Sequence, residues 1–132
     1  MTDILAVLLA WAGVLSGYTP PAHLPELVMV PHAWLVQRAC GGAECQVLGW
    51  HPPGDTVYLD DRLDPESDLL AASILVHELT HWLQQQPGRH AEGYACEDAI
   101  AMEREAYGVQ QRFLVAYGVY RPVGSSLHRV GC

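Results

Sequence analysis

The segment that decides the fold is DPESDLLAASILVHELTHWLQQQ, residues 64–86. Its apolar residues recur at steps of three and four, which is the spacing of one face of an α-helix. Asp64 suits the N-cap, Pro65 the first helical position, and Pro87 ends the pattern, so a helix is expected from Asp64 to about Gln86. The stripe that it would bury in the core consists of Leu69, Ala72, Val76, Leu79 and Leu83.

Two histidines lie four residues apart on this helix, away from its apolar stripe. Residues at that spacing share a face, so His77 and His81 can direct ring nitrogens to one ion. Glu78, about 100° further around the helix, can reach a water molecule on that ion. The pattern is that of a catalytic zinc site, in which three protein ligands leave one position for water and Glu78 is a general base, not a ligand. The alternative is a pair of surface histidines without a metal.

A third ligand is expected from a second helix, which the pattern places at about Ala95 to Tyr117. Only Glu103 puts a carboxylate in the middle of its inward stripe, and an inward carboxylate must be paired or bound to a metal. Glu103 is therefore the favoured ligand, and a buried pairing with Arg62 is its alternative. Glu105 points about 200° away and is expected to be solvated. The other candidates on this segment are Glu92, Glu97 and Asp98.

The rest of the chain predicts a small sheet and one more helix. Ile4 to Leu15 is apolar but too short to cross a bilayer, and is read as a buried N-terminal helix and not as a signal-peptide core. Short β-prone runs separated by Gly and Pro predict three or four strands, at residues 28–30, 34–36, 46–50 and 56–59. Residues 118–132 are expected to be irregular. The fold class is α+β, with one domain over residues 1–132.

Four cysteines permit two disulfides with three connectivities. The pairing that we favour joins Cys40 to Cys45 across a Gly-Gly loop and Cys96 to Cys132, which would tie the last residue to a helix. That pairing implies an oxidising compartment, so a periplasmic or secreted protein is expected. Four reduced, partly buried cysteines in a cytoplasmic protein are the alternative.

The composition of the chain limits the kinds of partner that the protein is expected to bind. The chain has 15 Asp and Glu against 7 Arg and no Lys, which argues against a surface for nucleic acid or anionic lipid. No stretch is long enough for a membrane span. At 132 residues the chain can fold without oligomerising, so a monomer is expected.

The sequence resembles the gluzincin branch of the zincin metallopeptidases over roughly Leu59 to Leu114. The resemblance rests on His77-Glu-Leu-Thr-His81, followed by Glu103-Arg-Glu-Ala-Tyr107, which is similar to the Glu-x-x-Ala-Asp of that group. Gln84-Gln85 adds a likeness to small bacterial proteins with His-Glu-Leu-x-His-x-x-Gln. This chain has Tyr107 where the family has the Asp that orients a ligand histidine, so it departs from the family there.

This resemblance implies a minimal zincin-like fold, with Zn²⁺ held by His77, His81 and Glu103 and a peptide or protein as substrate. Glu78 would take a proton from water and pass it to the leaving amine. The extended substrate would pair with the strand at 56–59. Tyr107 is the first candidate for the oxyanion donor and His128 the second. Two other functions stay open: a non-catalytic zinc-binding interaction module, and an amidase acting on a non-protein substrate.

Overall fold

A computed structural model describes the chain except for residues 1, 88, 90–94, 126 and 128–131. The described residues form a small α+β fold of four helices and a three-stranded mixed sheet, as predicted. In chain order the elements are α1 (Thr2–Ser16), β1 (Glu26–Val30), α2 (His32–Ala39), β2 (Gly49–Trp50), β3 (Thr56–Asp60), α3 (Leu69–Gln84) and α4 (Cys96–Ala116).

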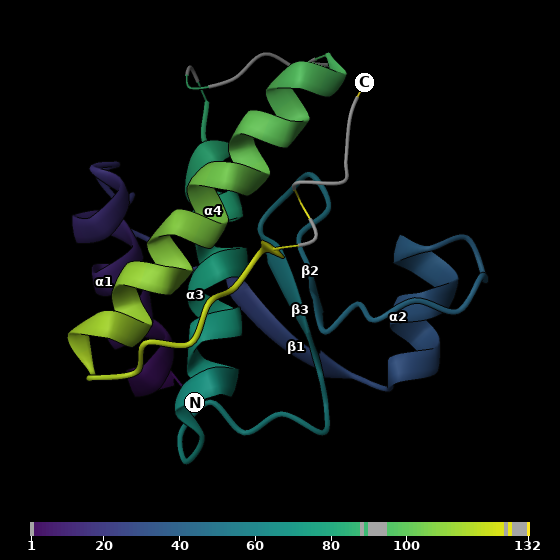
Figure 1. The fold of residues 1–132 in the computed structure, drawn as a ribbon, viewed down its shortest axis with the longest axis horizontal. Coiled ribbons are helices and arrows are strands. Elements are labelled where there is room, and N and C mark those ends of the chain that lie inside the picture. The colour runs from purple at the N-terminus through teal and green to yellow at the C-terminus, as the bar shows by residue number, and fades with distance from the viewer. Residues whose placement is uncertain (1, 88, 90–94, 126, 128–131) are drawn as a thin grey trace.

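The helix α3 lies at the centre of the molecule, with α1 and α4 packed along it and the sheet beside it (Figure 1). Four of the five residues of its predicted apolar stripe are buried, together with side chains from β3, and Leu69 at the start of the helix is partly buried. The apolar N-terminal segment is a helix that is buried on one face, which supplies a row of core residues at helical spacing, whereas Val7 and Val14 on it are exposed. That row is Leu5, Leu8, Leu9 and Ala12.

The strand order of the sheet is β1-β3-β2. β1 runs parallel to β3, with Leu27 opposite Val57, and β2 runs antiparallel to it, with Gly49 opposite Leu59. A parallel pair needs a crossover connection, and the connection between β1 and β3 contains α2 and β2. Val57 and Leu59 on the central strand are fully buried against the helices.

The segment at 34–36 is not a strand, so that prediction was wrong. It lies within α2, which packs on the sheet without extending it: the ring of Trp34 lies 4.6 Å from Tyr58 and 6.0 Å from Trp50. Three consecutive apolar residues are equally compatible with a strand and with one turn of a buried helix, so the sequence alone does not distinguish the two. Of the strand predicted at 46–50, only Gly49–Trp50 pairs with β3.

The start of the central helix also differs from the prediction. α3 begins at Leu69, and Asp68 is its N-cap, accepting a hydrogen bond from the Leu70 amide at 3.1 Å. Asp64 instead stabilises the preceding turn, where its carboxylate accepts from the Ser67 hydroxyl at 2.6 Å. Both aspartates suit an N-cap, so the sequence alone leaves two starting points four residues apart. The end of the helix, at Gln84, and the bounds of α4 agree closely with expectation.

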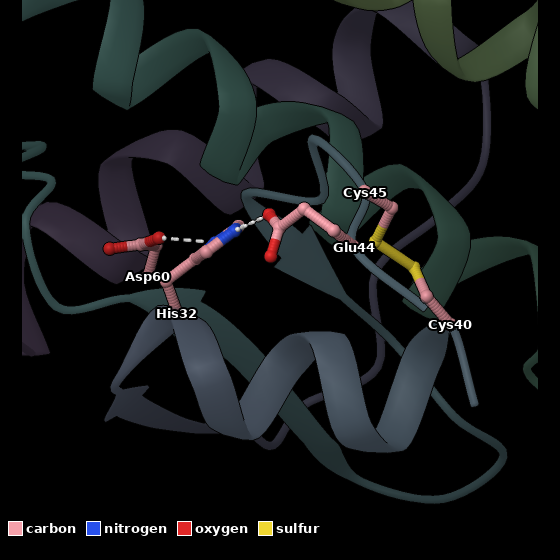
Figure 2. The surroundings of a disulfide bond; sticks show 5 residues. All are labelled: His32, Cys40, Glu44, Cys45 and Asp60. Carbon is pink, nitrogen blue, oxygen red and sulfur yellow. Dashed lines mark hydrogen bonds and ion pairs between the residues drawn. A yellow bond between two sulfur atoms is a disulfide. The ribbon is translucent and has the colours of Figure 1, made fainter. Parts of the chain in front are cut away.

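Two disulfides, Cys40–Cys45 and Cys96–Cys132, join the pairs that the sequence favoured. Beside the first, His32 bridges the carboxylates of Glu44 and Asp60 at 3.0 and 3.2 Å (Figure 2). These links hold the connection between α2 and β2 against the end of β3. Among the described residues, none of the helices combines the length and apolar character that a membrane crossing requires.

Candidate metal centre

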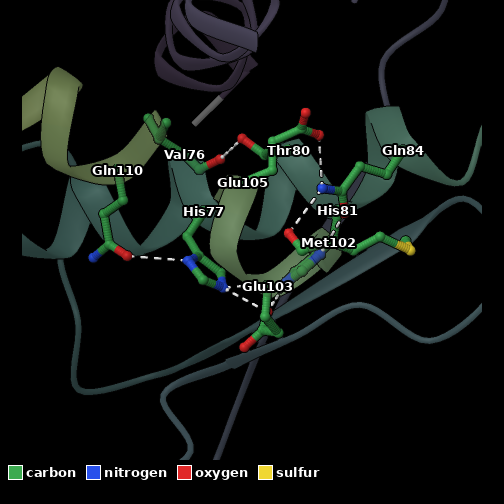
Figure 3. Close-up of polar contacts among 9 residues, drawn as sticks. All are labelled: Val76, His77, Thr80, His81, Gln84, Met102, Glu103, Glu105 and Gln110. Carbon is green, nitrogen blue, oxygen red and sulfur yellow. Dashed lines mark hydrogen bonds and ion pairs between the residues drawn. The ribbon is translucent and has the colours of Figure 1, made fainter. Parts of the chain in front are cut away.

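The structure brings the three predicted metal ligands together. His77 and His81 project from the same face of α3, and Glu103 reaches them from α4 (Figure 3). The two Nε2 atoms lie 3.1 Å apart, and His77 Nε2 lies 3.1 Å from Oε1 of Glu103. His81 Nε2 contacts the same carboxylate oxygen. In the described part of the chain, these residues form the one group of His, Cys, Asp or Glu that could hold a metal ion.

The distances from His77 Nε2 to the other two donor atoms fit a single tetrahedral ion. Ligand bonds of about 2.0–2.1 Å in a tetrahedral zinc site place neighbouring donors roughly 3.3 Å apart. The 3.1 Å separations at His77 are close to that value. Two imidazoles and one carboxylate are also a donor set that zinc accepts in catalytic sites. The residues present therefore fit a zinc ion with one position left for water or substrate.

Both ligand histidines are oriented from behind by glutamine side chains. His77 Nδ1 lies 3.0 Å from Gln110 Oε1, and His81 Nδ1 lies 2.8 Å from Gln84 Oε1 (Figure 3). The side chain that contacts His77 Nδ1 is thus Gln110 and not Tyr107. The backing of both rings was not predicted, although Gln110 lies in the inward stripe of its helix and Gln84 follows His81 by three residues.

The charged groups of the centre perturb one another. Burial lowers the pKa of His81, but its contact with Glu103 and the nearby charge of Glu78 outweigh that effect and raise it to about 9. Burial also acts to raise the pKa of Glu103, yet its hydrogen bonds to His77 and His81 hold that pKa well below its ordinary value. The cluster is thus a carboxylate facing two basic nitrogens, which favours binding of a cation among them.

Glu78 is a buried carboxyl group beside the candidate metal ligands. Its side chain is only 8% exposed, and burial raises the pKa of its carboxyl. No hydrogen bond from the described residues reaches its carboxylate, which lines the same cleft as the ligands. Gly49 of β2 packs against it so closely that a Cβ at this position would lie 2.7 Å from Glu78 Cγ. A glycine is therefore required for Glu78 to keep this conformation.

Tyr107 lies one turn of α4 beyond Glu103 and packs on the ring of His77. Its ring centroid is 4.4 Å from that of His77, and burial together with the charges of Glu103 and Glu78 raises the pKa of its hydroxyl. Gly124 packs on the other side, where a Cβ would lie 2.5 Å from Tyr107 Cγ. Tyr107 therefore lines the cleft with a hydroxyl that stays protonated at neutral pH. His128, the second candidate, lies outside the described residues.

A cleft of about 650 Å³ gives access to the centre. Residues 46–51, which include β2, line it together with residues of α3. Residues 121–124 line it too, because the chain after α4 runs back past α3 toward the sheet (Figure 1). Gln111 holds this returning segment, donating to the Arg121 carbonyl at 2.9 Å and accepting from the Val123 amide at 3.0 Å. The C-terminal segment thus supplies a wall of the cleft that the sequence did not predict.

The strand expected to pair with a substrate is not the one at the edge. β3, which contains Thr56–Leu59, lies between β1 and β2, and β2 pairs with it at Tyr58 and Leu59, so β3 is not the free edge that the prediction assumed. β2 pairs with β3 alone in the described part of the sheet, and its residues line the cleft. Strand order is a tertiary property, and the sequence pattern of 56–59 carries no information on it.

The other acidic candidates lie elsewhere. Glu105 was predicted to be solvated, and that prediction was wrong. Its carboxylate accepts hydrogen bonds from the Tyr18 hydroxyl at 2.6 Å and from Gln84 Nε2 at 2.9 Å. Glu97 and Asp98 are exposed in the first turn of α4, and Glu92 lies outside the described residues. Arg62 pairs with Asp60 at 2.6 Å and so is not the partner of Glu103.

Comparison of the chain with models of protein families, with curated proteins and with solved structures finds no match. The function must therefore be argued from the geometry and chemistry of the centre itself.

Proposed function

We propose that this protein is a zinc-dependent hydrolase, namely a metallopeptidase of the gluzincin type. The observation that carries the proposal is the convergence of His77, His81 and Glu103 beside the buried carboxylate of Glu78, in a cleft open to substrate. A structural zinc site is usually closed by four protein ligands, whereas three ligands with a free base nearby suit catalysis.

When bound, zinc would supply the Lewis acid that polarises a carbonyl and acidifies a water molecule. Glu78 would accept the proton of the attacking water, because no described residue donates a hydrogen bond to its carboxylate and its raised pKa is closer to neutral pH. The same side chain returns that proton to the leaving amine. Glu78 thus acts as base and then as acid within one cycle.

Tyr107 is the proposed donor to the oxyanion that develops on the scissile carbonyl. Its hydroxyl has no hydrogen-bond partner among the described residues, and its ring is fixed between His77 and Gly124. A donor that is held in place before reaction stabilises developing charge without reorganising. We place the substrate along the edge of β2, which has no second strand beside it in the described part of the sheet, so that an extended peptide could pair with it.

Two disulfides support a site of action in an oxidising environment, which is the periplasm or the outside of the cell. A substrate there would be a peptide or protein that meets the enzyme after export.

Elemental analysis of the purified protein, combined with hydrolysis of a mixed peptide library, tests the proposal. We expect about one zinc per chain, cleavage of library peptides, and loss of cleavage when a chelator removes the metal. A chain that holds zinc tightly but cleaves no peptide under any condition would favour the interaction module instead.

A further inference from the structure

The amide of Gln84 can take only one orientation. Its nitrogen donates to the Met102 carbonyl at 2.9 Å and to the Glu105 carboxylate at 2.9 Å, so both of its hydrogens are used (Figure 3). The Tyr18 hydroxyl holds that carboxylate from the other side at 2.6 Å. Gln84 is fully buried, and a flipped amide would place its oxygen against two acceptors. Its oxygen is therefore left to face His81 Nδ1.

The amide of Gln110 is fixed in the same way through a hydroxyl. The Ser73 hydroxyl donates to the Leu70 carbonyl at 2.7 Å, so its oxygen is the acceptor for Gln110 Nε2 at 3.1 Å. The oxygen of Gln110, which is 5% exposed, then faces His77 Nδ1. Different neighbours thus impose one amide orientation at both histidines.

An amide oxygen accepts hydrogen bonds and cannot donate them. Each Nδ1 must therefore carry the hydrogen, which leaves the lone pair of a neutral imidazole on Nε2. Both Nε2 lone pairs point to the place where the Glu103 oxygen also lies. Two lone pairs and a carboxylate oxygen at this spacing repel one another unless positive charge lies among them, either as protons on Nε2 in the metal-free chain or as a divalent cation that replaces those protons.

We propose that Gln84 and Gln110 are positioning residues that fix the tautomer and ring orientation of the two ligand histidines, so that the chain is preorganised to take a divalent cation. The proposal rests on the metal centre of the proposed function. In this centre the acceptors that contact the two Nδ1 atoms are neutral amides and not carboxylates. The carboxylate of Glu105 contacts Gln84 and reaches His81 only through that amide.

The test is a zinc titration against a competing chelator, combined with NMR of the zinc-loaded protein. Wild type should show two imidazole Nδ1–H protons that exchange slowly with water. Gln84→Leu and Gln110→Leu should each lose one of these protons and weaken zinc binding by about 10- to 100-fold. Gln86→Leu is the matched control: Gln86 contacts the Trp82 carbonyl and neither imidazole, so both readouts should stay as in wild type.

Substitution by glutamate separates positioning from packing. Gln110→Glu keeps the acceptor and should keep both the Nδ1–H proton of His77 and the zinc affinity. Gln84→Glu should fail, because it would place a second carboxylate against Glu105. If the two glutamines only filled space, both substitutions by glutamate should have the same effect on zinc affinity.

The outcomes distinguish this inference from the proposed function. Leucine variants that bind zinc like wild type, or a wild-type spectrum with Nε2–H imidazoles, overturn the inference alone. If the leucine variants do not fold, the wild-type spectrum and Gln110→Glu still decide it. A wild type that binds zinc but hydrolyses nothing overturns the proposed function alone, and a wild type that binds no metal overturns both.

Discussion

Gly49→Ala should impair catalysis without touching a metal ligand. Gly49 lies on β2, and the Cβ that the substitution adds would lie 2.7 Å from Cγ and 3.1 Å from Oε2 of Glu78. The backbone at this position has no left-handed φ, so alanine can adopt its conformation. The perturbation is therefore a direct displacement of the proposed general base.

The magnitude follows from that distance. Non-bonded carbons approach to about 3.5 Å, so the Glu78 side chain must move by roughly 0.8 Å. A misplacement of about 1 Å can reduce a rate by about 100-fold. We expect a fall in kcat of about 10- to 100-fold and, from overpacking, a loss of about 1–3 kcal/mol in the free energy of unfolding.

The assay is hydrolysis of a library peptide by Gly49→Ala protein, with zinc content measured on the same sample. Zinc content should equal that of wild type, because Glu78 does not bind the metal. Gly108→Ala on α4 is the control: it makes the same chemical change where a Cβ meets nothing within 4 Å. Wild-type turnover by folded Gly49→Ala would refute the placement of Glu78 as base.

Further predictions concern the ligands, the disulfides and the acid limit of stability. His77→Ala should lose bound zinc and Glu103→Gln should weaken its retention, as elemental analysis after dialysis would show; undiminished zinc in both would remove the site. The intact mass should rise by four hydrogens on reduction, two for each disulfide, and four free thiols before reduction would contradict an exported protein. The hydrogen bond from a neighbouring arginine keeps the pKa of Asp60 below its ordinary value, so this carboxylate stabilises the fold above about pH 4 and loses that effect as pH falls. Denaturant unfolding of Asp60→Asn should therefore depend less on pH in the acid range, and an unchanged pH dependence would contradict this assignment.

The sequence predicts the parts of this centre that helical spacing determines. His77, Glu78 and His81 follow from a local pattern on α3, and Glu103 follows from the phase of α4. The position of a residue in the helical repeat determines the face on which its side chain lies. The faces that carry His77 and His81 on α3 and Glu103 on α4 lie against each other.

Features that depend on how the elements pack together were not predicted. The edge position of β2 follows from strand order, and the role of 34–36 follows from contact with the sheet. The orientation of the Gln84 amide depends on its hydrogen bond to Glu105 of α4, which the sequence does not reveal. A buried glutamine in line with a ligand histidine is nevertheless a signal, because a buried amide requires partners on both of its ends.

The most direct test of the central claim is the rate of peptide hydrolysis by zinc-loaded Glu78→Gln relative to wild type. The substitution keeps the volume of the side chain and removes the basic oxygen, so zinc content and melting temperature should stay near those of wild type. The rate should fall by about two to four orders of magnitude. A variant that retains the full rate of wild type would contradict a zinc hydrolase in which Glu78 moves the proton.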